Sequence, residues 1–553
     1  MLIKRSKVHK DLFHSGKESW WIIGFSILMA SNILIEPQLI TSFLMNGDLS
    51  GMWLVWASGI GAVFGMVFFG HLWQRLPVKT ENELLLFRFS GKGARWLHIF
   101  RSLYVGGIVS PLILSMVFMA FARVLQQILE ISMLNSLVLI LLYLLLGTLF
   151  NSFRNRIRVD FLLLVLFSGL LVFIFIKLHH NLGSLEDIKE AITASNLNYS
   201  IFPDFGSKAF SAFLVFIFVQ WWAAEVIDMP GSTGQKLMSA RNPQTIAKSI
   251  VFPQLFFVAF FILINLMPFF ILLLDPESIH GLDKETAFLT IFTSAFKGGD
   301  IYLVILFFLI PFTALTFNIQ NWSGALLTQN FYNYYVRPQA SDIELNITGK
   351  LAMLLIGFLA FVFAYYNDSI LEIIKYLLTI TAGVGPVFIL RWYWHRINAW
   401  VQLSAMVTSL IFPTLYDIFY ANFDWFASLI NHLMIALNLD FFPAKIIVLT
   451  VAVSLVWLLV MQVSPPTDTK IVRKFINTIK PGGIWNVSNN GKIQFWKRLF
   501  VAILLTLNYV LIFVVLWKIV NMKFWVSAML LVGYVVVAIV AYQLLKKINL
   551  KHG

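Results

Sequence analysis

Long apolar runs repeat along the whole chain, and each is close to the length that a helix needs to cross a bilayer. About 20 residues, rising roughly 1.5 Å each, span some 30 Å of hydrocarbon. Polar or Gly/Pro segments separate the runs, so we expect an all-α, polytopic membrane protein of about fourteen transmembrane helices. These helices are expected to begin near Trp20, Met52, Leu97, Leu134, Val159, Phe210, Ile250, Ile301, Leu351, Ile370, Ala399, Ala444, Val501 and Phe524.

The composition supports this fold class. Of the 553 residues, 59% are hydrophobic and 12% are charged, whereas a soluble domain carries roughly 25% charged residues. Cysteine is absent, which excludes disulfides and thiolate metal sites. The net charge of +14 lies between the apolar runs, so it indicates membrane topology and gives no reason to expect nucleic-acid binding.

Positive charge falls in every second loop, which the positive-inside rule assigns to the cytoplasm. The first nineteen residues carry five basic residues and no apolar core, so they do not form a cleavable signal peptide. We therefore expect a multi-pass protein of the bacterial inner (cytoplasmic) membrane with both termini cytoplasmic. The basic segments are residues 1–19, 75–95, 154–158, 236–248, 337, 391–396, 470–498 and 546–551.

Two predicted spans contain residues that a lipid-facing helix avoids. The first span includes ASNILIEPQ (30–38), and the sixth continues into EVIDMPGSTG (225–234). Five helices separate the starts of these spans, and an odd offset gives the second group of five an inverted topology. Transporters built from inverted repeats break one helix in each half, where the freed backbone groups bind ion and solute. We expect a tail (1–19), two five-helix repeats (20–207 and 208–397) and a four-helix extension (398–553) with a basic loop at 463–498.

Helical spacing places the polar groups of each break on one side. Asn32 and Glu36 are four residues apart, while Trp221, Glu225 and Asp228 follow at i, i+4 and i+7. An ionisable group costs at least about 2.5 to 3.5 kcal/mol at the bilayer centre and is usually functional there. The predicted solute-binding residues are Asn32, Glu36, Trp221, Trp222, Glu225, Asp228, Gly231, Ser232 and Gln320.

Simpler interpretations of these residues are open. Residues 230–234 could form a loop at the membrane edge, and Asp228 could bond to nearby backbone amides. Glu36 and Glu225 could pair with a neighbouring helix. Trp221 and Trp222 are placed to close over a solute, although aromatic residues at this depth are often packing or interface anchors.

A third polar strip lies in the eighth span, FTALTFNIQNWSGALLTQNFY (312–332). Thr313, Thr316, Gln320 and Ser323 follow one helical face, whereas Asn318 and Asn321 lie on another. Hydroxyl and amide side chains in spans also join helices to each other, and that role would suffice for either strip alone.

Several runs resemble the sodium:solute symporter family. They are SWWIIGFSILMASNI, QWW with GQKLMSARN, NWSGALLTQNFY, AGVGPVFILRWYWHRINAW and IKPGGIW. The resemblance implies the five-plus-five inverted-repeat fold of the leucine-transporter type, with a moving bundle (helices 1, 2, 6 and 7) and a scaffold (chiefly helices 3, 4, 8 and 9). It implies a solute at the two breaks, no cofactor, and sodium as the coupling ion. The helix 1 carbonyls of Ala30 and Ile33 and the helix 8 carbonyl of Pro311 would bind that sodium.

The helix 8 half of this sodium site departs from the family pattern. The usual pair of hydroxyl residues falls on Ala314 and Leu315, which offer no side-chain oxygen, whereas a hard cation wants several oxygen ligands. Three accounts are open: Thr313 or Thr316 replaces the pair after a shift in helix register, a carboxylate in the breaks binds the cation or carries a proton, or coupling is lost. The resemblance ranks sodium first.

Two other classes of function are disfavoured. A membrane enzyme would need clustered acid, base or metal-ligating groups at membrane depth, but His179, His180 and His280 fall in predicted outside loops. A sensor would need an output module, and none is visible after Lys546. We expect a cation-coupled symporter whose partners are a small organic solute, sodium or a proton, and the bilayer. The identity of the solute and the oligomeric state do not follow from the sequence.

Overall fold

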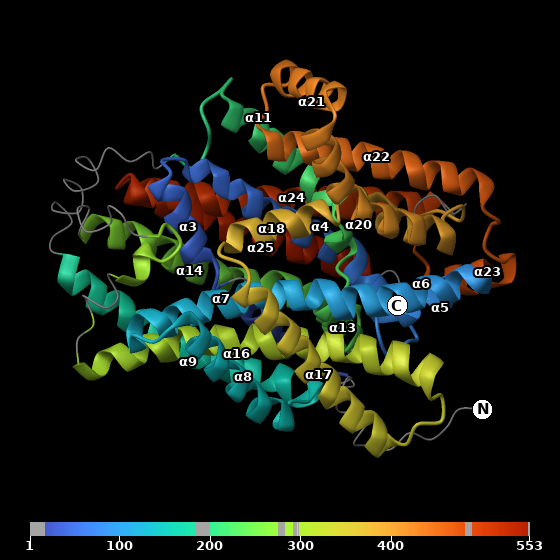
Figure 1. The fold of residues 1–553 in the computed structure, drawn as a ribbon, viewed down its shortest axis with the longest axis horizontal. Helices are drawn as coiled ribbons and strands as arrows, with labels where there is room; N and C mark the ends of the chain where they lie inside the picture. Colours follow the sequence, from blue (N-terminus) through green and yellow to red (C-terminus); the bar gives the residue numbers. More distant parts are fainter. Residues whose placement is uncertain are drawn as a thin grey trace.

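The computed structural model describes residues 17–31, 33–182, 200–274, 283–290, 296, 298–481 and 489–550, and within them it contains helices and no β-strand. Eleven of the described helices are long and apolar enough to cross a membrane. Three further spans are each divided into shorter helices, so the all-α, polytopic architecture is confirmed. In Figure 1, α21 (Asp424–Ala436) and α22 (Phe441–Val463) lie toward one edge of the molecule, and α8 (Met133–Phe150), α9 (Phe153–Leu182) and α17 (Asp342–Tyr365) lie toward the opposite edge.

The uninterrupted spans follow the expected order along the chain. They are α4 (Trp53–Arg75, preceded by η1, Leu49–Met52), α6 (Gly91–Tyr104) joined through η2 (Val105–Val109) to α7 (Ser110–Leu129), α8 (Met133–Phe150), α9 (Phe153–Leu182), α14 (Pro243–Leu274), α16 (Ile301–Ala325) joined to η6 (Leu326–Val336), α17 (Asp342–Tyr365), α20 (Ala399–Asn422), α22 (Phe441–Val463), α24 (Asn489–Val520) and α25 (Phe524–Leu550). Short helices outside these spans are α5 (Glu83–Arg88), η5 (Gly298–Asp300), α21 (Asp424–Ala436) and α23 (Thr469–Ile479).

The first span is broken where the sequence predicted it. Helix α2 (Trp20–Met29) stops before Ala30, and α3 (Glu36–Met45) begins with Pro37 in its first turn. Proline has no N–H, so it cannot bond to the carbonyl of Ile33, four residues earlier. The Ser31 hydroxyl donates to the Leu28 carbonyl at 2.7 Å, which satisfies a carbonyl at the end of α2. The break therefore leaves backbone oxygens inside the protein.

The sixth span is broken as well. It runs through α11 (Lys208–Val215), η3 (Phe216–Gln220) and α12 (Trp221–Ala223), continues as a single 3-10 turn, η4 (Glu225–Asp228), and resumes as α13 (Ser232–Met238). Between η4 and α13, Met229 and Gly231 have φ angles of 58° and 83°. Gly231 adopts this left-handed conformation without strain, and Pro230 next to it has no N–H to continue the helix.

A third division was not predicted. The tenth span consists of α18 (Ile370–Thr379) and α19 (Gly385–Tyr393), with a turn at 380–384 in which Gly383 has φ 81°. A Cβ at Gly383 would lie 2.8 Å from that of Val453 on α22, so glycine also allows this close approach. Helix α19 begins against the second break, and the carbonyl of Trp222 would lie 1.9 Å from a Cβ on Gly385.

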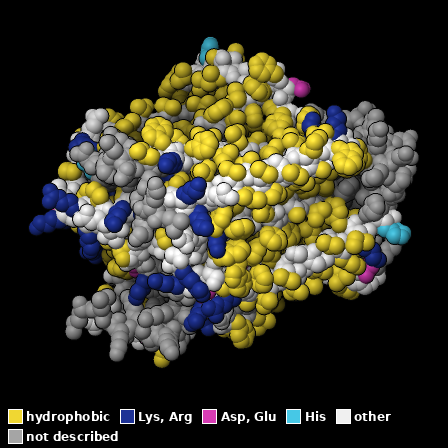
Figure 2. Space-filling view, turned by 180° about the vertical axis from the view of Figure 1, so that it is seen from behind, with side chains coloured by type: hydrophobic (Ala, Val, Ile, Leu, Met, Phe, Trp, Pro, Cys, Tyr) yellow, Lys and Arg dark blue, Asp and Glu magenta, His cyan; other side chains and the backbone are white. Residues whose placement is uncertain are grey.

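The exterior matches a membrane protein. Large apolar side chains are exposed along α8, α9, α22 and α25, where they would meet lipid. Figure 2 shows a broad hydrophobic face, with Lys and Arg gathered mainly toward one end of the molecule. The last two helices, α24 and α25, pack against α4 and α14, and this places the C-terminal part of the chain beside the two breaks.

The contact between α19 and the second break gives a testable prediction. Gly385→Ala places a methyl group against backbone that cannot move aside, which we expect to destabilise the protein by about 1–3 kcal/mol or more. The melting temperature of the purified protein in detergent measures this. Gly169→Ala on α9 is the matched control, because no atom lies within 4 Å of a Cβ there and alanine favours a helix. A Gly385→Ala variant as stable as the control would contradict the close approach.

Candidate functional site

The two breaks share one cavity of about 270 Å³. Ala30, Ser31 and Glu36 line it from the first break, and Met229 and Thr233 line it from the second. The remaining walls come from α2, α4, α14, α24 and α25. The structure thus brings the interrupted segments together, as the pattern of breaks predicted, and Glu36 is the charged side chain among the described residues that line the cavity.

Two predicted residues of the sixth span face elsewhere. The indole N–H groups of Trp221 and Trp222 donate to the carbonyls of Ile217 and Phe218, one turn earlier, at 2.7 and 2.5 Å. Both rings line a separate, largely aromatic pocket with Phe64. They do not line the cavity that holds Glu36.

Asp228 is fully buried and is tied to α19. Its carboxylate accepts hydrogen bonds from Arg391 at 2.6 and 3.0 Å and from the indole N–H of Trp392 at 2.6 Å. Its backbone carbonyl accepts from the indole N–H of Trp73 at 2.6 Å. Asp228 therefore stabilises the second break through a distant helix, and the expected local turn bonding is not what occupies its carboxylate.

The remaining predicted residues of the breaks have different fates. The backbone N–H of Gly231 donates to Glu81 at 3.0 Å, and Ser232 begins α13 with a partly exposed side chain. Asn32 and the side chain of Glu225 lie outside the described residues.

The polar strip of the eighth span faces the neighbouring long helices. Thr313 donates to the Leu309 carbonyl at 2.6 Å and lies 2.7 Å from the hydroxyl of Tyr143 on α8. Gln320 donates to the Met353 carbonyl on α17 at 3.0 Å. Thr316 is completely buried one turn before Gln320. Neither threonine lines the cavity at the breaks, nor does Pro311, so the geometry favours a helix-joining role for this face.

A buried charged cluster, the Asp160 cluster, joins four helices, and our sequence reasoning missed it. The Asp160 carboxylate on α9 accepts from Arg156 at 2.5 and 2.7 Å and from Asn318 of α16 at 3.1 Å, and it accepts from the Ser26 hydroxyl of α2. The Lys236 ammonium of α13 donates to the Ser26 backbone carbonyl at 2.9 Å. All five side chains are at most 6% exposed. The cluster ties both half-helices of the breaks to α9 and α16.

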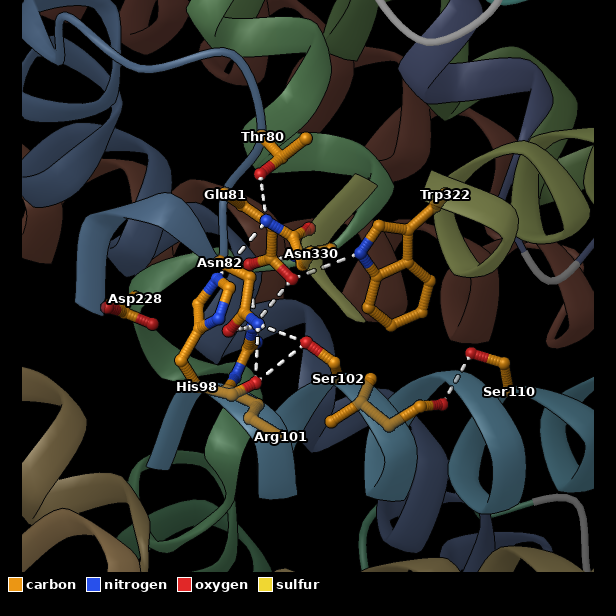
Figure 3. Close-up of polar contacts among 12 residues, drawn as sticks. Thr80, Glu81, Asn82, His98, Arg101, Ser102, Ser110, Asp228, Trp322 and Asn330 are labelled. Carbon is orange, nitrogen blue, oxygen red and sulfur yellow. Dashed lines mark hydrogen bonds and ion pairs between the residues drawn. The ribbon is translucent and has the colours of Figure 1, made fainter. Parts of the chain in front are cut away.

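A second buried network, the Glu81 clamp, meets the second break from the segment between α4 and α5. Figure 3 shows the Glu81 carboxylate between Arg101 of α6 and Trp322 of α16. It accepts from Arg101 at 2.9 and 3.2 Å, from the Trp322 indole N–H at 3.0 Å, and from the N–H of Gly231 at 3.0 Å. The ring of Trp322 also lies against Gly231. The clamp therefore pairs the Gly231 backbone N–H with a side chain from outside the helix, and it joins the break to three other segments.

The electrostatics of the clamp favour an ionised Glu81. Burial opposes the charge, but the Arg101 guanidinium and the N–H donors of Gly231 and Trp322 outweigh it, so the pKa of the carboxyl lies below its usual value. The surrounding side chains continue the network: Asn82 donates to Ser102 at 2.8 Å, and Asn330 donates to Thr80 at 2.7 Å.

A third network, the Glu285 clamp, lies near the end of α7, whereas the Glu81 clamp contacts α6 at the start of the same span. The Glu285 carboxylate pairs with Arg123 and accepts from the backbone N–H of Ile370 at 3.1 Å, at the start of α18. Arg123 also donates to the carbonyl of Asp368 at 2.6 Å. The segment after α14 is therefore fastened to α7 and α18, on the opposite side of the breaks from the Glu81 clamp.

Sequence signals existed for part of what was missed. Arg156 and Asp160 are an i, i+4 pair, and Asp160 is followed by a long apolar run, the pattern of an acid drawn into a span. Glu81 had no such signal, because its partners, Arg101, Gly231 and Trp322, come from three other segments of the chain. Only the folded chain shows that it meets the second break.

A family model described as the sodium:solute symporter family matches residues 17–409. The chain belongs to the sodium:solute symporter family. A solved structure entitled "Substrate-bound outward-open state of a Na+-coupled sialic acid symporter reveals a novel Na+-site" has the same fold, with a TM-score of 0.62 and 15% identity over 84% of this chain and 94% of that one.

Similarity to curated relatives is confined to short regions. The osmoregulated proline transporter OpuE of Bacillus subtilis is 32% identical over 87 residues, which are 15% of this chain and 18% of the relative. The sodium/proline symporter of Haemophilus influenzae is 26% identical over 107 residues, which are 19% of this chain and 21% of the relative. Each alignment thus spans about a fifth of the relative's length.

The Glu81 clamp yields a stability prediction. Glu81→Gln removes one partner of a buried ion pair, which costs about 3–5 kcal/mol when the other charge stays buried. Because folding lowers the pKa of Glu81, its contribution is complete above the usual carboxyl value of 4.5 and is lost as the pH falls through the lower, folded value. The difference in melting temperature between the wild type and Glu81→Gln should therefore be constant above pH 4.5 and shrink below it.

Glu372→Gln on the exposed start of α18 is the control, since its partner Lys375 is three residues away on the same surface. The free energy of unfolding of that variant should lie within about 0.5 kcal/mol of the wild-type value. A Glu81→Gln difference that does not change with pH would mean that the carboxylate charge does not stabilise the clamp.

Proposed function

We propose that this protein is a secondary active transporter that carries a small organic solute across the cytoplasmic membrane by alternating access, with sodium as the coupling ion. The observation that carries the proposal is the shared cavity between two interrupted membrane helices, α2/α3 and α12/α13. Broken helices in lipid are tolerated where they are buried in protein or line a cavity, and transporters use them to bind ion and solute near the bilayer midplane. Membership of the symporter family supports the same activity.

The arrangement of ties supports a moving bundle and a fixed scaffold. We assign residues 20–207 and 208–397 to two inverted repeats and residues 398–553 to an extension. The Asp160 cluster connects α2 and α13, the half-helices of the bundle, to α9 and α16. The Glu81 and Glu285 clamps lie on opposite sides of the breaks. Opening one side for the solute would require the clamp on that side to release, which is how two-sided gating produces alternating access.

On the helix 1 side of its expected position, sodium would be bound by backbone carbonyls. The Ile33 carbonyl is freed by Pro37, and the Ala30 carbonyl lies at the same break. The helix 8 side departs further from the family pattern than the sequence suggested, because the Ala314 carbonyl accepts from the Asn318 amide at 2.7 Å. We therefore propose that the Asp160 carboxylate, one of whose oxygens contacts Ser26 and Asn318, supplies the negative charge that attracts the cation to this region.

A proton-coupled or uncoupled transporter is the second candidate. It is favoured by the Lys236 ammonium, which is buried against the Ser26 carbonyl of α2, one turn before Ala30. A fixed positive charge there disfavours a bound sodium ion and could replace it. The orientation with both termini cytoplasmic rests on the alternation of basic loops and on the clustering of Lys and Arg in Figure 2.

The test is uptake into proteoliposomes across a panel of labelled solutes, with sodium and proton gradients imposed separately. The panel begins with proline, because curated relatives are named as proline transporters, and extends to sugars, carboxylates and amines. Accumulation driven by an inward sodium gradient supports the proposal. Accumulation driven by a proton gradient alone would favour the second candidate, and the absence of uptake of every solute under both gradients would contradict transport.

Asp160→Asn tests the coupling site. The substitution leaves the charges of Arg156 and Lys236 without their carboxylate, so we expect the sodium concentration for half-maximal uptake to rise by about tenfold or more, a change of at least about 1.4 kcal/mol in binding. Thr313→Val is the control, since Thr313 bonds to α8 and its own helix. An equal rise in both variants, or in neither, would remove Asp160 from sodium binding.

A further inference from the structure

Glu36 differs from the buried carboxylates of the described chain. Each of the five acidic side chains that are buried there has an Arg partner within 4 Å. Glu36, in contrast, faces the cavity, and among the described residues no Lys, Arg or His forms an ion pair with it. The paired acids are Glu18 with Arg158, Glu81 with Arg101, Asp160 with Arg156, Asp228 with Arg391 and Glu285 with Arg123.

The neighbour that Glu36 does have is neutral. Asn265, a neutral amide fully buried on α14, lies near it, and its amide N–H donates to the Phe261 carbonyl at 2.6 Å. A neutral amide does not compensate the charge of a carboxylate. A charge without a partner is costly at membrane depth, so this carboxyl group is either protonated or paired with a positively charged occupant.

Part of the cavity wall is aromatic. Trp56, Phe257, Tyr509 and Tyr534 line it together with Glu36. Two of the rings are held in place by their hydroxyl groups: Tyr509 donates to the Trp56 carbonyl at 3.0 Å, and Tyr534 donates to the Gln254 carbonyl at 3.2 Å. No Lys, Arg or His is among the described residues that line the cavity.

We propose that this cavity binds a small organic cation, an amine or quaternary ammonium group that pairs with Glu36 and lies against the aromatic rings. Aromatic faces attract alkylammonium groups through the ring quadrupole, and cages of aromatic rings with a carboxylate are how proteins bind them. A cavity of about 270 Å³ is far larger than one inorganic ion.

The C-terminal helices supply two of these four rings. Tyr509 comes from α24 and Tyr534 from α25, beyond residues 17–409 that match the family model. Gly59 of α4 makes the room: a Cβ there would lie 2.2 Å from the Tyr509 hydroxyl. The rest of the lining, Glu36 included, lies within the family match, and cation binding at this cavity can be measured separately from transport.

Isothermal titration of the purified full-length protein in detergent tests the proposal with choline and its neutral isostere 3,3-dimethylbutan-1-ol. The two probes have the same shape, and only the ammonium nitrogen differs from carbon. We expect saturable binding of choline and at least about tenfold weaker binding of the isostere. Glu36→Gln should weaken choline binding by at least about tenfold. The exposed-acid variant Glu372→Gln should bind choline as the wild type does.

Three results would overturn the proposal. They are equal binding of choline and the isostere by the wild type, unchanged choline binding in Glu36→Gln, and competitive displacement of choline by NaCl but not by KCl, which would make Glu36 a sodium site. If Glu36→Gln does not purify as a folded protein, Glu36→Asp keeps the charge, and the comparison of the two probes on the wild type still decides. Transport could fail in liposomes while choline still binds, and the reverse, so the two proposals fail separately.

Discussion

In hydrocarbon every backbone N–H and C=O needs a partner within the protein, and this requirement shapes the rest of the structure. A continuous helix meets it locally. The breaks at α2/α3 and α12/α13 do not, so the surrounding helices must supply the missing partners. The Gly231 N–H is met by Glu81 and the Asp228 carbonyl by Trp73. The Ser26 carbonyl, near the end of α2, accepts from Lys236 as well as from the Ala30 N–H. Each break is thus held by side chains that come from other helices.

Three of the carboxylates around the breaks are each paired with an arginine. A buried ion pair adds little net stability compared with apolar packing, but removing one partner is severely destabilising. Such pairs therefore specify which segments meet. Glu81 with Arg101 fixes the second break to α6 and α16, Asp228 with Arg391 fixes it to α19, and Asp160 with Arg156 gathers α2, α9 and α16. The same pairs are natural points of release in a transporter, because solvating both partners recovers much of the energy lost when they separate.

Sequence reasoning reached what depends on local chemistry. Apolar runs located the spans, and Pro37, Pro230 and Gly231 located the breaks, because proline and glycine act on the backbone beside them. It did not reach contacts between segments distant in the chain. Helical phase placed Asp228 beside Trp221. The extended backbone of Ala224 and the following turn of 3-10 helix separate their directions, however, so Asp228 faces α19 and Trp221 faces an aromatic pocket. The division of α18 from α19 was missed because it depends on the close approach of Gly383 to α22, which is distant in the sequence.

The position of the C-terminal helices explains why Glu36 remains unpaired. In the other buried acids an arginine reaches the carboxylate from a neighbouring helix or from the next helical turn. The walls around Glu36 include α4, α14, α24 and α25, and none of the side chains that they contribute to the cavity lining is positively charged. Two tyrosines lie there, Tyr509 and Tyr534, and each hydroxyl donates to a backbone carbonyl, so neither hydroxyl donates to the acid. Fixed rings beside a single negative charge suit a cation that arrives from outside the chain. Because Glu36 begins α3, binding of that cation would act directly on the first break.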